Sequence, residues 1–381
     1  MKQGGIVMKK FIIIPDSFKG TISSHEVCQI IEKEIKAQFH DADIKKIPVA
    51  DGGEGSVDAF LEAKPGKKIY VEAKNPYFET IKAFYGLIDQ GKTAVIEMAA
   101  CAGLPLVEDR KNPSKTTTYG VGELVIDAID HGAKKIILGL GGSATNDGGA
   151  GFAQALGVVF KDIHGHPFLP TGGTLHLIKD IDIKGIDPRI KDIEFLTMCD
   201  IDNPLYGFDG AAYIFGPQKG ANPEMVKMLD DNLKHYANIV HEKLGFKEHD
   251  FKGAGAAGGM GFAAKVFLNS KIQMGIEAVL DVMRFDELAQ NADYIITGEG
   301  KLDSQSLRGK VVIGVARRAK KTKAKVIAVV GSMEGSIEDF KKEGVSDVVI
   351  TNYENLDFES LKPRAKQDMA YTVQRYLTTL S

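Results

Sequence analysis

Strand–loop–helix patterns at both ends of the chain constrain its fold most. The apolar run 10–14 predicts a buried strand, and after a polar loop Ser23 and Glu26 predict the capping box of a helix. A second strand near 44–49 also precedes a loop and a helix, and strands alternate with helices again from residue 293. Because such alternation builds parallel α/β sheets, we predict a split, doubly wound domain from residues 1–66 and 287–381.

Residues 67–286 predict a second α/β domain, inserted into the first. Alternating segments within 67–98 predict an antiparallel meander, and residues 120–131 predict a helix. Strands are expected at 194–198 and 211–215. A long helix is expected after Asn222, with a proline at its first position and a glycine to stop it.

The glycine-rich stretch 139–151 follows the apolar run 135–138 and precedes a helical pattern. Glycine permits positive φ and close approach to a ligand, and free N–H groups before a helix attract anions. A tight structural turn with an aspartate N-cap is the alternative. Because four more such loops occur elsewhere in the chain, we favour a ligand site.

Acidic and lysine residues follow several predicted strands of both domains. Carboxylates held together need a cation between them, and Mg²⁺ or lysine would serve. Glycine amides, Mg²⁺, lysine and a carboxylate base facing one inter-domain cleft are the parts of a phosphoryl-transfer site. The sequence contains neither a phosphate loop of the Walker type nor the protein-kinase motifs.

The candidate residues fall into three sets. The residues predicted to be catalytic are Lys19, Asp51 and Asp200. Those predicted to bind substrate or phosphate are Asp16, Ser17, Gly52, Gly53, Gly142, Ser143, Thr145, Asn146, Asp147, Lys219, Gly300 and Lys301. Those predicted to bind the metal are Asp51, Glu54, Glu299 and Asp303.

Composition excludes several classes of partner. The net charge of −3, with dispersed basic residues, predicts neither nucleic-acid nor membrane binding. Three cysteines without metal spacing, and no long apolar run, predict a cytoplasmic protein whose residues 1–7 form a loose extension.

His164 and His166 predict a hairpin turn rather than a metal site. The stretch 253–261 fits phosphate binding and close helix packing equally well.

Six motifs together resemble the bacterial type-1 glycerate kinase family, in the same order along the chain. They are Pro15-Asp16-Ser17-Phe18-Lys19, Ala50-Asp51-Gly52-Gly53-Glu54-Gly55, the stretch 141–149, Gly216-Pro217-Gln218-Lys219-Gly220, the stretch 253–259 and Thr297-Gly298-Glu299-Gly300. The resemblance implies phosphorylation of D-glycerate by ATP, commonly to 2-phosphoglycerate. It also implies a flavodoxin-like domain split by a domain of restriction-enzyme-like topology. Gly20 departs from the family, whose members often carry glutamate there.

Two other functions stay open at this stage. The first is a kinase of the same fold that gives 3-phosphoglycerate or acts on another small hydroxy acid. The second is a non-catalytic sensor of sugar acids. A sensor for an anion gains nothing from several carboxylates at one sheet edge, whereas a Mg·ATP site does, so the acidic loops favour the kinase.

Overall fold

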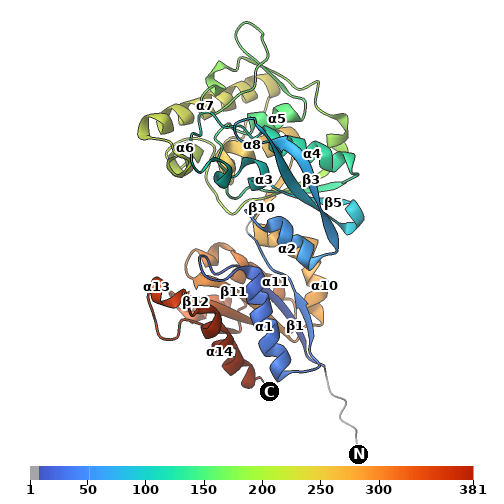
Figure 1. Ribbon diagram of the computed structural model, residues 1–381, viewed down its shortest axis with the longest axis vertical. Helices are drawn as coiled ribbons and strands as arrows, with labels where there is room; N and C mark the ends of the chain where they lie inside the picture. Colours follow the sequence, from blue (N-terminus) through green and yellow to red (C-terminus); the bar gives the residue numbers. More distant parts are fainter. Residues whose placement is uncertain (1–7, 51, 381) are drawn as a thin grey trace, which may run out of the picture. The chain divides into compact units, whose positions relative to one another are not determined.

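The computed structural model describes residues 8–50 and 52–380 and consists of two compact units (Figure 1). The first unit takes the described residues up to 50 and from 276 onward, and the second takes those from 52 to 275. The expected extension 1–7 and the candidate Asp51 lie outside the described residues.

The first unit is built on a parallel five-stranded sheet in the order β13-β12-β11-β1-β2. Its strands are β1 (Lys10–Pro15), β2 (Asp43–Lys46), β11 (Tyr294–Leu302), β12 (Lys325–Met333) and β13 (Asp347–Ile350). Its helices are α1 (Ser24–Gln38), α10 (Phe285–Gln290), α11 (Val311–Ala319), α12 (Ile337–Lys342), α13 (Phe358–Leu361) and α14 (Ala365–Thr378), with α9 (Gly275–Val282) starting at its edge. The predicted α/β pattern at both ends of the chain is confirmed.

Helices α1 and α14 lie side by side against this sheet (Figure 1). Phe11 and Ile13 of β1 share one buried cluster with apolar residues of both helices. The predicted capping box is confirmed: Glu26 N donates to Ser23 Oγ at 3.3 Å, and Ser23 N donates to Glu26 Oε2 at 3.0 Å. Helix α11 packs against β1, β11 and β12 outside that cluster.

The second unit has a mixed six-stranded sheet in the order β10-β9-β6-β5-β4-β3. Its strands are β3 (Gly66–Lys74), β4 (Thr80–Ile88), β5 (Thr93–Glu97), β6 (Lys135–Gly139), β9 (Glu194–Met198) and β10 (Lys271–Gln273). Strands β3, β4 and β5 form the predicted antiparallel meander, whereas β5, β6, β9 and β10 run parallel. Parallel neighbours bring the carboxyl ends of β6 and β9 to one edge, where two candidate loops begin.

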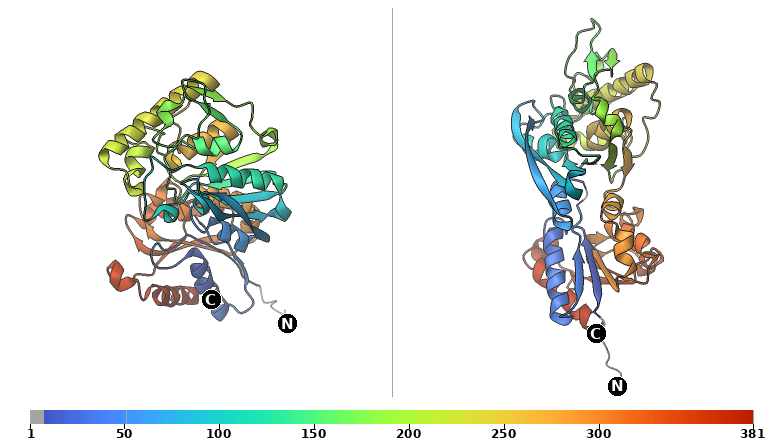
Figure 2. Two further views of the ribbon diagram at one scale, coloured as in Figure 1. Left: turned by 45° about the horizontal axis from the view of Figure 1, so that its top comes forward. Right: turned by 90° about the vertical axis from the view of Figure 1, so that its right-hand side faces the viewer.

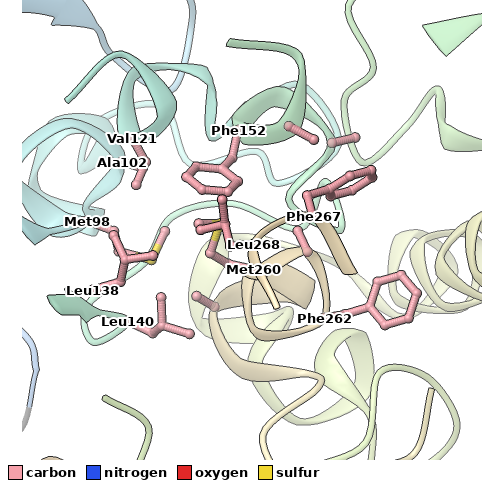
Figure 3. Close-up of a cluster of buried hydrophobic side chains, with 14 of the residues drawn as sticks. Met98, Ala102, Val121, Leu138, Leu140, Phe152, Met260, Phe262, Phe267 and Leu268 are labelled. Carbon is pink, nitrogen blue, oxygen red and sulfur yellow. The ribbon is translucent and has the colours of Figure 1, made fainter. Parts of the chain in front are cut away.

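Helices and aromatic side chains cover this sheet, and one continuous core joins the sheet to all of its helices except α2 (Figure 3). The helices are α2 (Ser56–Ala63), α3 (Ala99–Ala102), α4 (Tyr119–Asp130), α5 (Ala150–Ala155), α6 (Ala211–Phe215), α7 (Pro223–Leu244) and α8 (Ala256–Leu268). Leu140, Phe152 and Met260 join this core from the glycine-rich loop, α5 and α8. Helix α7 confirms its prediction, because Asn222 caps its first turn and Gly245 ends it with φ of 73°.

The prediction of a strand at 211–215 was wrong, since this segment is helix α6. Its apolar run is too short for periodicity to distinguish a strand from a buried helix. Ala211 and Ala212 are buried, and α6 packs against α7 and α8. These tertiary contacts therefore decide its conformation.

The edges of the two units differ from the predicted boundaries at 66/67 and 286/287. Helix α2 packs on β4 and β5, and its Val57 N donates to the buried carboxylate of Glu97 at 3.2 Å. Helices α9 and α10 are held by Arg318 of α11, which donates to Glu277, Asp281 and Asp286 at 2.6–2.9 Å. These contacts between residues distant in sequence shift both boundaries toward the N-terminus.

A small two-stranded sheet completes the second unit, in which β7 (Val159–Lys161) pairs with β8 (Asp180–Asp182) (Figure 2). After β7 the chain turns through His164 and His166, whose N–H groups both donate to Asp162 Oδ1. The expected turn is confirmed. Within residues 8–50 and 52–380, no helix is long and apolar enough to cross a membrane.

Candidate active site

The glycine-rich stretch is a strand-to-helix loop, as predicted. It begins at the end of β6 and leads into α5, whose first residue is Ala150. Gly142 has φ of 72°, a backbone conformation that L side chains rarely adopt. The loop also bonds to its surroundings, since Gly141 N donates to Gly52 O at 3.0 Å and Ala144 N donates to Ala102 O at 2.8 Å. It is therefore a fixed part of the second unit.

A cavity of about 200 Å³ opens at the carboxyl ends of β6 and β9. It includes four of the predicted site residues: Gly142, Ser143, Asp200 and Lys219. The remaining lining residues are mostly apolar: Leu104, Leu140, Gly141, Met198, Cys199, Ile201, Phe215, Gln218, Ala256 and Ala257. An apolar pocket with a few convergent polar groups is the usual form of a small-molecule site.

Lys219 supplies the cation of this pocket. It ends a short 3₁₀ turn, Pro217–Lys219, between α6 and α7 and is only 2% exposed. Its ammonium donates to Ser143 Oγ at 2.8 Å and to Thr145 O at 2.7 Å. Burial lowers the pKa of Lys219 to about 7, and the nearby carboxylate of Asp147 opposes this shift. The side chain can therefore bind an anion, or exchange a proton near neutral pH.

Asp200 follows β9 directly and also lines the pocket. Its Oδ1 accepts a hydrogen bond from Gly275 N at 2.7 Å, at the first residue of α9. This bond fixes the carboxylate at the carboxyl end of the strand. In that position it can accept a proton from a bound hydroxyl group, the role predicted for one carboxylate of the site.

Asp147 lies in the same loop but has a different environment. It is fully buried, and its two oxygens accept four hydrogen bonds: from Thr118 N and Oγ1 at 2.8 Å, Gly149 N at 3.1 Å and Gly151 N at 3.2 Å. Burial raises its pKa, and these donors oppose the shift. The carboxylate joins the first turns of α4 and α5, so we leave it out of the proposed ligand set.

Thr145 and Asn146 are also fully buried and do not line the pocket. Their side-chain polar atoms have no hydrogen-bond partner among the described residues. The loop in which they lie packs against the start of α8, where Gly148 N donates to Gly258 O at 2.9 Å. A Cβ on Gly258 would lie 2.1 Å from Thr145 O. Close packing, one of the two alternatives for the stretch 253–261, thus accounts for Gly258.

Acidic candidates gather at the carboxyl edge of the first unit. Asp16 N donates to Gly298 O at 2.8 Å, and a Cβ on Gly300 would lie 3.7 Å from Lys19 N. Glu299, which lies between Gly298 and Gly300 in the sequence, is 6% exposed. Its Oε1 has no hydrogen-bond partner among the described residues. Burial, together with the charges of Asp16 and Asp303, raises the pKa of Glu299 to about 7.

Strand β11 carries the candidates Glu299, Gly300 and Lys301. It continues to Leu302 because residues 298–302 pair with β12 as far as Met333. Lys301 is exposed there and pairs with Glu334 at 2.7 Å, which directs it to a surface carboxylate.

The remaining candidates divide between the two units. Ser17 and the exposed Lys19 lie in the loop after β1, and Asp303 follows β11. Gly52, Gly53 and the exposed Glu54 belong to the second unit, where a Cβ on Gly52 would lie 3.2 Å from Met198 Cβ.

Several pocket residues were missed by the sequence predictions. Gln218 directly precedes the predicted site residue Lys219 in a motif flanked by glycines. This adjacency could have indicated from sequence that Gln218 lies in the pocket. Cys199 is buried and lines the pocket, a position that no predicted motif indicated. Ala256 and Ala257 come from a segment distant in sequence, and only the packing of α8 brings them to the pocket.

Comparison with known proteins identifies the family. The model of the glycerate kinase family matches residues 11–381. The glycerate kinase of Bacillus cereus is 48% identical over 340 residues, covering 89% of each chain. The glycerate 2-kinase of Escherichia coli K12 is 46% identical over 351 residues, covering 91% of this chain and 92% of that one. A crystal structure from Salmonella typhimurium LT2 matches with a TM-score of 0.86 and 41% identity over 98% of both chains. Sequence and fold thus agree over nearly the whole chain, which belongs to the glycerate kinase family and is a kinase.

Proposed function

We propose that this enzyme phosphorylates D-glycerate with ATP and Mg²⁺ and releases 2-phospho-D-glycerate. The relative from Escherichia coli, named a glycerate 2-kinase, supports both the substrate and the position of transfer. The observation that carries the proposal is the pocket at the ends of β6 and β9, which joins a buried cation to a carboxylate.

The size of the pocket supports a small substrate. Its volume of about 200 Å³ is below the roughly 300–1,000 Å³ of pockets that enclose drug-sized ligands. A three-carbon acid fits such a space. In the proposed mechanism Asp200 accepts the proton of the attacking hydroxyl group, while Lys219 and Ser143 hold the acid.

The acidic edge of the first unit supports a role in holding Mg²⁺. No group of three or more His, Cys, Asp or Glu side chains in the described part of the chain could hold a metal ion alone. Mg²⁺ needs only one or two carboxylates when phosphates and water complete its shell, and the unpartnered buried Oε1 of Glu299 fits that need. Glu299 and Asp303 would hold the ion. A bound Mg²⁺ would neutralise charge on the phosphates.

Lys19 and the backbone of Gly300 lie at that same edge, and we propose that they contact the phosphates of ATP. The strand order of the first unit, counted along that unit, is 2-1-3-4-5, which supports a flavodoxin-like assignment. The restriction-enzyme-like assignment of the second unit rests on family resemblance. The three cysteines are buried and form no disulfide, which is consistent with the proposed cytoplasmic location.

An ADP-release assay and phosphorus NMR with the purified protein test the proposal. We expect ADP release that depends on D-glycerate, ATP and Mg²⁺ together, and a phosphorus NMR spectrum of 2-phosphoglycerate. A 3-phosphoglycerate product would favour the first alternative. Tight binding of glycerate without any ADP release would favour the sensor.

A further inference from the structure

Lys219 is a buried cation whose printed hydrogen-bond acceptors are neutral. Its side chain is 2% exposed, and among the described residues its ammonium donates to Ser143 Oγ and Thr145 O rather than to a carboxylate. The carboxylate whose charge acts on the pKa of Lys219 is that of Asp147, and its oxygens already accept four hydrogen bonds from other groups. Buried charges in proteins are normally paired, because an unpaired charge loses its hydration without compensation. The position of Lys219 in the pocket wall therefore indicates an anionic partner that enters with the ligand.

Ser143 adds a directional hydrogen-bond donor beside this charge. An ammonium group can only donate hydrogen bonds, so Ser143 Oγ must act as the acceptor in its 2.8 Å bond with Lys219. The hydroxyl hydrogen of Ser143 is then available to donate into the pocket that both residues line. Two adjacent donors, one of them charged, favour the two oxygens of a carboxylate over a neutral hydroxyl group.

We propose that Lys219 and Ser143 form the carboxylate-recognition site of the pocket and that Lys219 supplies the charge that makes the enzyme select acids over neutral polyols. This inference rests on the proposed function, which it deepens by naming the groups that recognise the substrate carboxylate. The anionic oxygen could also belong to the phosphoryl donor. The pocket volume of about 200 Å³ favours the small acid.

The site also predicts uptake of a proton. Because burial lowers the pKa of Lys219 to about 7, much of it is neutral in the free enzyme above that pH. A carboxylate beside it favours the charged form, so acid binding would protonate it. The other titratable groups of this region are Asp200 and Cys199, which line the pocket, Asp147, whose charge acts on Lys219, and Tyr236, on which Asp147 also acts. The pKa of Cys199 is raised to about 11 and that of Tyr236 is raised well above its usual value, both by burial, so neither titrates near pH 7.

The test compares Lys219→Met with the wild type, since methionine keeps an apolar stem of similar length but removes the charge. We expect the KM for D-glycerate to rise roughly a hundredfold, the scale for losing a buried charge partner, while the KM for ATP stays within about twofold. Glyceramide, the neutral amide, is expected to bind the variant and the wild type equally. Lys227→Met, on the exposed face of α7, is the matched control and should leave both constants unchanged. A higher KM for ATP alone would instead assign Lys219 to the phosphate donor and overturn the inference.

Calorimetry on the unmodified enzyme gives a second test that needs neither turnover nor a folded variant. At pH 8, D-glycerate binding in buffers of different ionisation enthalpy should reveal uptake of about one proton, because the pKa of free Lys219 is about 7. Binding without proton uptake, or no binding, would overturn the inference. Failure of the proposed function is separate, because it shows as an absence of ADP release.

Discussion

Asp147→Asn and Asp147→Ala should destabilise the second unit, because the carboxylate joins two helix starts rather than contacting a ligand. In the native structure Oδ2 of Asp147 accepts from Thr118 N, Thr118 Oγ1 and Gly151 N, and Oδ1 accepts from Gly149 N. Asparagine can keep the first three bonds with its carbonyl oxygen but turns an NH₂ group toward Gly149 N. One buried donor then loses its acceptor, which costs about 1–3 kcal/mol.

Alanine removes all four acceptor contacts at once. Three of the stranded donors are backbone N–H groups at the first turns of α4 and α5, and no water can reach a site with 0% exposure without rearrangement. Because the Thr118 hydroxyl can rotate toward another partner, the loss is less than four full penalties. We expect on the order of 4–5 kcal/mol, at the upper end for single substitutions.

Urea denaturation followed by circular dichroism measures the loss, and steady-state kinetics at low temperature measures affinity in the folded fraction. Asp231→Asn, in an exposed ion pair on α7, is the control and should change stability by less than about 0.5 kcal/mol. If Asp147→Asn kept wild-type stability and raised the KM for glycerate or ATP, the carboxylate would be a ligand contact and the reasoning would be wrong.

Three further predictions concern the two units separately. Lys19→Met should lower kcat roughly a hundredfold, about 3 kcal/mol, with an unchanged denaturation midpoint, as kinetics and circular dichroism would show. Glu299→Gln should raise the Mg²⁺ concentration needed for half-maximal activity, measured by Mg²⁺ titration, because it removes an anionic ligand. Gly258→Ala should cost at least about 3 kcal/mol in denaturation, since its Cβ would lie 2.1 Å from Thr145 O at φ of 69°. Gly132→Ala, with φ of 90° but open space around it, should cost only about 1 kcal/mol.

Each of these predictions has an opposing outcome. If Lys19→Met had wild-type kinetics, Lys19 would be a surface lysine without a catalytic role. Lys33→Met, at an exposed position of α1, is the control for the effect of losing a surface lysine on kcat. An unchanged Mg²⁺ requirement in Glu299→Gln, matching the control Glu334→Gln, would remove Glu299 from the metal site. Equal losses in Gly258→Ala and Gly132→Ala would show that backbone strain, rather than close packing, dominates at Gly258.

The sequence alone determined the elements whose signals are local. Buried apolar runs with glycine-rich loops predicted the strand-to-helix units, and the capping residues Ser23 and Asn222 marked helix starts that the structure confirms. The family followed from motifs in order along the chain. These features depend on neighbouring residues, so a single sequence can reveal them.

Tertiary structure decided what depends on residues distant in sequence. The segment 211–215 is too short to reveal its period, and packing against α7 and α8 makes it a helix. Asp147 and Lys219 both stand in glycine-rich motifs, yet four internal donors surround Asp147, whereas Lys219 is buried in a pocket wall without an ion-pair partner among the described residues. Burial and the supply of hydrogen-bond donors set the role of a charged side chain, and both arise only when separate segments of the chain pack together.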